Sequence, residues 1–247
     1  MAPTKGNDQA LLVDEVIWNA DTAELTTAIA VSELETPNLA MTANEYSPNL
    51  PDWTIEHSGY MTGVAADEIE AEMSARRGTT GSTVAHLFTR STTNSPAYVL
   101  PSAGLFGQGW GAPVADVLTV SGTWRNDDGQ GYRGALVTYN TTVTATGDGT
   151  SIDLGSAGSS GGVAYLFVHT IDTDISGTAT DASFKIQSSS DNSSFADEGT
   201  FTVGATGAFS ATLSGTVNRY VRLNTADLGG ATSFTVTLIA CVADVTY

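Results

Sequence analysis

Alternation of apolar and polar residues with a period of two runs through most of this chain and constrains its fold more than any other feature. β-branched residues are abundant in the alternating segments, and this pattern places every second side chain on one face of a strand. Clear examples are residues 25–34, 53–62, 132–146 and 233–242. The sequence therefore predicts a mainly β protein.

One segment departs from this pattern and predicts a helix from Ala65 to Arg77. Acidic residues in its first turn and arginines in its last turn both complement the helix dipole. Gly78 suits the position that follows a helix end, and Ile69 and Met73 lie four residues apart on a narrow apolar face. We expect this helix to flank the sheets.

The amino-acid composition of the chain changes near residue 148, and we expect a domain boundary there. Residues 1–148 contain the longer strands and the helix, with Asn126–Gly131 predicting a hairpin turn between the strands on either side of it. Residues 149–247 are rich in Gly, Ser and Thr, and short strands recur about every dozen residues, which is typical of a β-sandwich. The second block is predicted to fold independently.

A long loop is predicted from Glu35 to Pro51, because three prolines and three asparagines in this stretch oppose regular structure. Loops above about 15 residues are uncommon unless they have a function. This one contains four apolar side chains that are unfavourable in water, which predicts contacts between subunits. They are Leu39, Met41, Tyr46 and Leu50.

Acidic residues outnumber basic ones by 27 to 9, giving a formal charge of −18. Nucleic-acid and anionic-membrane surfaces are bound by clustered Lys and Arg, so this balance argues against both ligands. Self-repulsion of this size is screened in molar salt, where the Debye length is about 3 Å. A halophilic source therefore fits the charge, and an acidic mesophilic protein is the alternative.

Residues that could carry chemistry are scattered rather than grouped. His57, His86 and His169 each lie alone in a strand-like segment, without a second ligand at metal spacing. The one cysteine, Cys241, lies in an apolar run that predicts a buried thiol. We therefore expect no enzyme activity, no cofactor and no metal site, and we interpret Asp127–Asp128 and Asp172–Asp174 as turn residues. The sequence also shows no secretion signal and no apolar run of the ~20 residues that span a membrane.

Several segments of the chain resemble the major tail-tube proteins of long-tailed, siphovirus-like viruses. In the first block these are an N-terminal arm, the stretch Tyr46–Trp53, a strand ending Gly59–Gly63, the helix 65–77 and Asp116–Gly122. In the second block, Gly161–Val168, Phe184–Phe195 and Gly215–Leu223 resemble an accessory domain carried by many such proteins.

This resemblance implies a tail-tube-type β-barrel or sandwich with one flanking helix, followed by a C-terminal β-sandwich. It implies subunits in stacked hexameric rings that form the DNA conduit of a viral tail, without catalysis or specific DNA binding. Its partners would be other copies of itself and tail proteins such as the tape measure and the tail terminator. Assembly would occur in the host cytoplasm, and the acidity suggests a virus of a halophilic archaeon.

Two alternatives remain open at the level of sequence. One is a capsid decoration or another minor virion protein built from the same accessory module. The other is a carbohydrate-binding β-sandwich. The four tryptophans bear on the second alternative, and we expect all of them to be structural except Trp110, which lies among glycines and is the candidate for exposure.

Overall fold

The computed structural model describes residues 8–18, 22–36, 45–60, 69–90, 94–111, 118–158, 161–173, 181–213 and 215–242. It is mainly β, with antiparallel sheets and one short helix, as the alternation predicted. The chain divides into two compact units, and each is described by itself. Unit 1 contains residues 1–19, 85–99 and 132–247, and unit 2 contains residues 20–84 and 100–131.

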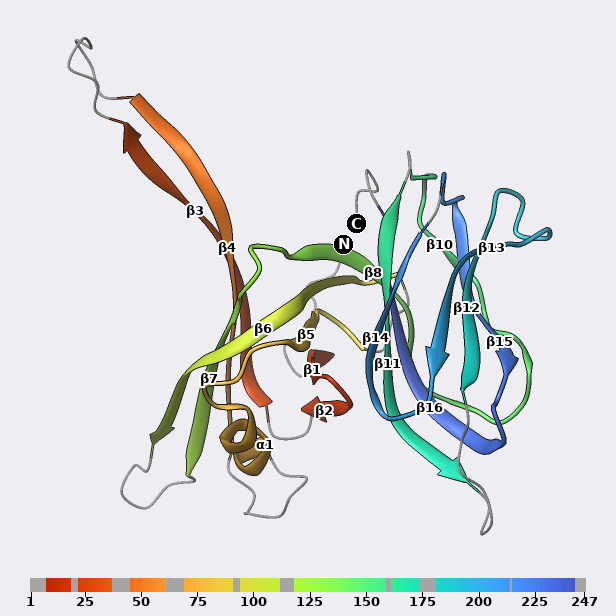
Figure 1. Ribbon diagram of the computed structural model, residues 1–247, viewed down its shortest axis with the longest axis horizontal. Helices are drawn as coiled ribbons and strands as arrows, with labels where there is room; N and C mark the ends of the chain where they lie inside the picture. Colours follow the sequence, from red (N-terminus) through yellow and green to blue (C-terminus); the bar gives the residue numbers. More distant parts are fainter. Residues whose placement is uncertain are drawn as a thin grey trace. The chain divides into compact units, whose positions relative to one another are not determined.

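Unit 1 contains most of the strands (Figure 1). They are β1 (Ala10–Val13), β2 (Val16–Trp18), β8 (Tyr132–Val143), β9 (Gly147–Asp148), β10 (Ile152–Asp153), β11 (Gly162–Thr173), β12 (Ala182–Ser189), β13 (Ala196–Val203), β14 (Gly207–Thr212), β15 (Tyr220–Asp227) and β16 (Ala231–Val242). Two further strands, β5 (Ser82–Leu87) and β6 (Pro96–Gly111), contribute residues to both units.

A sandwich forms the larger part of unit 1. One sheet runs β14-β11-β16-β8 and continues into the unit 1 parts of β6 and β5, while the other runs β10-β15-β12-β13. Their facing side chains form one core, in which the rings of Phe184 and Phe234 meet edge to face with centroids 5.2 Å apart. A second cluster, including Leu12, Phe167 and Ile239, covers the other face of the first sheet. This sheet is therefore buried on both faces, which explains why β11 and β16 contain continuous apolar runs.

Besides its part of β6, unit 2 contains β3 (Thr22–Thr36), β4 (Glu45–Tyr60), β7 (Thr119–Asn126) and the helix α1 (Ile69–Arg76). Its strands form one four-stranded antiparallel sheet in the order β3-β4-β7-β6. Met73 of α1 is fully buried, and Arg76 pairs with Glu72 one turn earlier. The predicted helix is thus observed over Ile69–Arg76, and its predicted first turn lies outside the described residues.

Strand β6 was not expected from the sequence and corrects the predicted hairpin at Asn126–Gly131. It pairs with β8 through Pro96–Val99 and with β7 through Ala103–Gly111, so β7 and β8 do not pair with each other in the described sheets. The turn instead carries the chain from unit 2 into unit 1. Pro96, Pro101 and four glycines concealed this strand, because both residue types are rare inside strands and are tolerated at bulges and edges.

The independent folding of residues 149–247 remains a prediction. The compact unit that contains residues 149–247 also contains β8, which pairs with β16 along most of its length. Ala135 and Val137 of β8 belong to the core of the sandwich.

Candidate assembly surface

Strands β3 and β4 form a long ribbon that continues beyond the rest of the unit 2 sheet (Figure 1). They pair with each other from Thr22–Gly59 to Thr36–Glu45, whereas β7 pairs with β4 only between Thr54 and Tyr60. We call residues 29–36 and 45–53 the arm. A two-stranded ribbon is only marginally stable by itself in water. The arm would therefore be stabilised by packing against another surface.

The predicted loop at Glu35–Pro51 needs correction because its ends are strands. Residues 35 and 36 end β3, and residues 45–51 begin β4, with a bulge where Val31 pairs with Pro51 and Glu33 with Pro48. Prolines are compatible with a strand at such irregular or edge positions. The predicted contact residues Tyr46 and Leu50 lie in β4, and their side chains are outside the described residues. Leu39 and Met41 lie outside the described residues altogether.

One face of the unit 2 sheet is apolar and covered. Leu25, Ile55, Val120 and Trp124 are buried along it, together with His57. A Cβ at Gly122 would lie 2.5 Å from His57 Cε1, so glycine at this position makes room for the imidazole ring. Burial lowers the pKa of His57 to about 4, and the ring is therefore neutral at pH 7.

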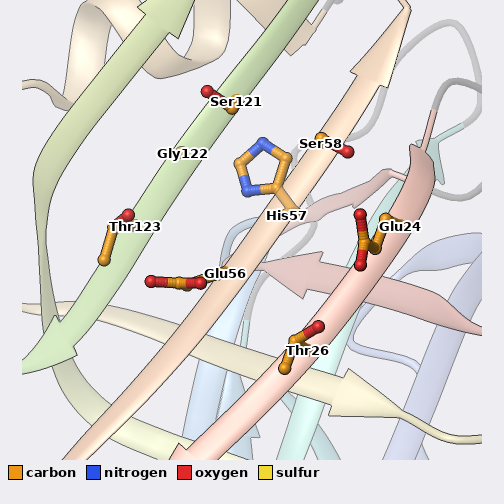
Figure 2. A pocket seen from close by; sticks show the side chains of 8 residues that line it. All are labelled: Glu24, Thr26, Glu56, His57, Ser58, Ser121, Gly122 and Thr123. Carbon is orange, nitrogen blue, oxygen red and sulfur yellow. The ribbon is translucent and has the colours of Figure 1, made fainter.

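The opposite face of this sheet is rich in oxygen atoms. Directly paired residues share a face, and the rows Glu24–Ser58–Ser121 and Thr26–Glu56–Thr123 cross β3, β4 and β7 in register. They surround a hollow of about 270 Å³, also lined by His57 and Gly122, and Figure 2 shows the side chains on the three neighbouring strands. None of the six row residues is basic. This face can hold water and repel anions.

The large apolar side chains that the structure exposes all belong to unit 2. Among the described residues, Ile29 and Val31 on β3 are 47% and 51% exposed, and Phe106 and Trp110 on β6 are 64% and 52% exposed. Tyr60 at the end of β4 is the fifth. β3 and β6 are the two outer strands of the sheet, so exposed apolar side chains lie on both, on the β6 edge of the sheet and on the part of β3 that belongs to the arm.

Gln108 of β6 pairs directly with Gly122, so its side chain lies on the covered face, in the same row as His57. Its Nε2 and Oε1 atoms are buried and have no hydrogen-bond partner within the described part of the chain. A buried amide without partners costs about 1–3 kcal/mol per group. The sequence had singled out Trp110 but gave no indication of Gln108 or Phe106, because the expected strand pattern did not include β6.

The predicted non-catalytic residues are placed as follows. Cys241 is buried, and burial raises the pKa of its thiol. His169 donates from Nδ1 to the Glu15 carbonyl and accepts at Nε2 from the Thr237 hydroxyl. Asp128 accepts a hydrogen bond from the Gln130 N–H, as expected in a turn. The turn interpretation was wrong for Asp172, which lies in β11 and accepts a hydrogen bond from the Ser233 hydroxyl of β16.

Two further observations concern metal ions and membranes. Within the described ranges no three His, Cys, Asp or Glu side chains lie together as a candidate metal site. Over the same ranges, no helix has the length and apolar character needed to cross a membrane. Trp18 and Trp124 are buried and Trp53 is half-buried, in agreement with their predicted structural roles.

Comparisons with known proteins give weak likenesses to tail proteins. Neither a protein family nor a curated protein matches the sequence. Among solved structures, the SPP1 tail tube is similar over 50% of this chain and 75% of its own, with a TM-score of 0.37 and 11% identity. A virion of a native gene transfer agent particle is similar over 50% and 94%, with a TM-score of 0.33 and 8% identity. SPP1 Dit, described as part of a hub adsorption apparatus, is similar over 94% and 97%, with a TM-score of 0.33 and 10% identity.

Proposed function

We propose that this protein is a non-catalytic structural subunit of a viral tail, and that it forms the tail tube by joining copies of its unit 2 sheet edge to edge. One observation carries the proposal: the exposed large apolar side chains of the described chain gather in unit 2, with two on each outer strand of its sheet. Exposed apolar surface of this kind marks association sites.

The four-stranded unit 2 sheet suits head-to-tail association of copies, because its two outer strands run in opposite directions. All three pairings in the order β3-β4-β7-β6 are antiparallel, so β3 and β6 run in opposite directions. Placing β3 of one copy beside the Phe106–Gly111 part of β6 in the next copy therefore continues the antiparallel pattern. Such a contact uses two different surfaces and repeats, and it closes into a ring when the rotation between copies allows.

Proline distinguishes the two long edges of the arm. Pro48 and Pro51 lie in β4 and lack the N–H that a ladder requires, whereas β3 contains no proline from Thr22 to Thr36. Native proteins protect sheet edges with proline, and here the protected edge is that of β4. This asymmetry favours β3 as the edge that accepts another strand.

The oxygen-rich face suits the wall of a DNA conduit. It is the face opposite the buried side chains, and the sequence has no Lys or Arg anywhere between residues 6 and 75. A carboxylate- and hydroxyl-lined wall repels phosphate, so DNA would pass without binding. We infer that Glu24, Glu56 and their neighbouring hydroxyls face the lumen of the ring.

The remaining details of the proposal concern assembly. Rings would contain six copies and stack through the arm, with Leu39, Met41, Tyr46 and Leu50 in contact with the neighbouring ring. The tape measure and the tail terminator would be partners within the virion. The charge of −18 would require high salt for stable association, as in a virus of a halophilic archaeon.

The experiment compares two double substitutions of equal charge in molar sodium chloride. Phe106→Asp with Trp110→Asp should leave a folded monomer, because both changes place a carboxylate on the β6 edge. Thr200→Asp with Thr202→Asp changes two exposed residues of β13 in unit 1 and should assemble as the unchanged protein does. Negative-stain microscopy and sedimentation give the assembly state, and circular dichroism gives the fold.

The outcomes separate the alternatives. Rings or tubes that survive the β6 substitutions would contradict edge-to-edge joining. Compact trimers of the unchanged protein would favour a capsid decoration protein. Because Trp110 is 52% exposed, glycan binding that is lost on Trp110→Ala would favour the carbohydrate-binding alternative.

A further inference from the structure

The arm leaves the unit 2 sheet at a position held by a side chain instead of a strand. The backbone ladder between β4 and β7 ends at the pair Thr54–Arg125. One residue further along each strand, the side chain of Asn126 replaces the missing backbone partner. Its Oδ1 accepts a hydrogen bond from the Trp53 N–H at 3.0 Å, and its Nδ2 donates to the Pro51 carbonyl at 3.4 Å.

Asn126 is itself firmly held. Its backbone pairs with Ala103 in β6, and the following N–H of Asp127 donates to the Ser102 carbonyl at 3.0 Å. The turn that continues to Gly131 contains Gly129 with a φ of +74° and a bond from the Gln130 N–H to Asp128 Oδ1. The side-chain amide of Asn126 is therefore held in place by the sheet, and it binds the β4 strand of the arm.

Trp53 contacts the same turn from the side of the arm. A Cβ added at Gly131 would lie 2.2 Å from the Trp53 ring, so the indole lies directly against the backbone there. Further along the ribbon, the regular pairing of β3 and β4 is interrupted by a bulge between Pro51 and Pro48. A bulge bends and twists a ribbon locally, and this bulge lies next to the last contact with the turn.

We propose that Asn126 and Trp53 form a pivot that sets the angle at which the arm leaves the sheet and keeps the outer part of the ribbon in one direction. Asn126 is a positioning residue in this role. The pivot concerns the arm whatever surface it docks on, and it does not depend on the tail-tube proposal. Without the Asn126 hydrogen bonds to β4, the chain would keep its sheet, but its arm would lose its defined direction.

Hydrogen exchange of the full chain tests the pivot residue by residue. Asn126→Ala removes both bonds, so exchange of the Trp53 amide should rise roughly three- to tenfold, the equilibrium value of one hydrogen bond. Asn126→Asp keeps the acceptor and should preserve protection of this amide. Residues Thr54–Tyr60 should exchange as before in both variants.

A matched control is Asn224→Ala in unit 1. Asn224 is also a half-buried strand asparagine whose Nδ2 donates to a backbone carbonyl of a neighbouring strand, that of Gly147 at 3.4 Å. Its removal should leave the arm unchanged. Loss of protection throughout unit 2 in Asn126→Ala would overturn the proposal, because Asn126 would then hold the sheet and not the arm.

Spin-label distances test the change of angle directly. Labels on Glu35→Cys in the arm and Ser121→Cys in β7 report the direction of the ribbon, and the buried Cys241 does not compete for the label. Asn126→Ala should broaden the distance distribution, and Asn224→Ala should not. Equal distributions in both variants would overturn the pivot.

Discussion

Unit 1 covers its central sheet on both faces, whereas unit 2 covers its sheet on one. In unit 1, side chains from two sheets and the N-terminal strands fill two clusters around β11 and β16. In unit 2, the described buried side chains are fewer, and five large apolar side chains are exposed. The charge follows the same division: unit 2 has fourteen acidic and three basic residues in its shorter length, and unit 1 has thirteen and six.

This difference leads us to propose that stability and association lie in different parts of the chain. A sheet buried on both faces gains stability from its own chain and has little apolar surface to offer a partner. A sheet with exposed apolar side chains on its outer strands, a polar face and a projecting ribbon gains stability when another copy covers it.

The first prediction concerns the predicted boundary at residue 148. A fragment of residues 149–247 should unfold cooperatively, as its sandwich pattern indicates. A fragment of residues 132–247 should be more stable by about 3 kcal/mol or more, because β8 covers β16 and contributes Ala135 and Val137 to the core. Urea titration followed by circular dichroism measures both fragments. A disordered 149–247 fragment would contradict the boundary.

The second prediction compares two phenylalanines. Phe184→Ala in the full chain should lower the free energy of unfolding by about 3–5 kcal/mol, because it leaves a cavity beside Phe234. Phe106→Ala removes a ring that is 64% exposed and should change it by less than about 0.5 kcal/mol. Thermal and denaturant unfolding of the monomer give both values. Equal costs would show that unit 2 is as tightly packed as unit 1.

The third prediction uses one buried histidine in each unit. Burial lowers the pKa of both His57 and His86 to about 4, below the value of about 6.5 in an unfolded chain. The unfolded state therefore binds protons first, and stability that is complete above pH 6.5 falls as the pH drops toward 4. Each histidine accounts for about 3 kcal/mol at most.

His57→Gln and His86→Gln separate the two contributions. Each should flatten the pH dependence of unfolding measured in urea between pH 7.5 and pH 4. His86 stacks on Phe88 with ring centroids 4.5 Å apart, so its replacement should also cost some stability at pH 7.5. A slope that is unchanged in both variants would mean that carboxylates cause the acid sensitivity.

The fourth prediction concerns the close packing of the covered face in unit 2. Gly122→Ala should destabilise the protein by about 1–3 kcal/mol, because the new Cβ would lie 2.5 Å from His57 and 2.7 Å from Met73. Gly204→Ala in unit 1 is the control, since its Cβ would meet nothing closer than 3.5 Å. Both are measured by thermal unfolding, and equal shifts would contradict a close contact at Gly122.

Alternation in the sequence predicted most strands of the sandwich because each has one face or both faces in a core. Strands were predicted at residues 163–170, 183–188, 219–224 and 233–242, and β11, β12, β15 and β16 end within three residues of these bounds. The burial of Cys241 and Trp124 followed from the same pattern. These properties depend on local periodicity, which a single sequence displays directly.

The pairing of the strands and the exposure of their side chains depend on the tertiary structure. Strand β6 contains two prolines and four glycines, so its periodicity is weak, yet it pairs with both β7 and β8 and forms one edge of the unit 2 sheet. The support that Asn126 gives to β4 joins residues 73 and 75 positions apart, and the exposure of Phe106 depends on how β6 pairs with β7 on either side of it. The β class, the sandwich strands and the acidic surface could be predicted from the sequence, because they follow from composition and local period. The open edges and the arm were decided by long-range pairing, which no local pattern encodes.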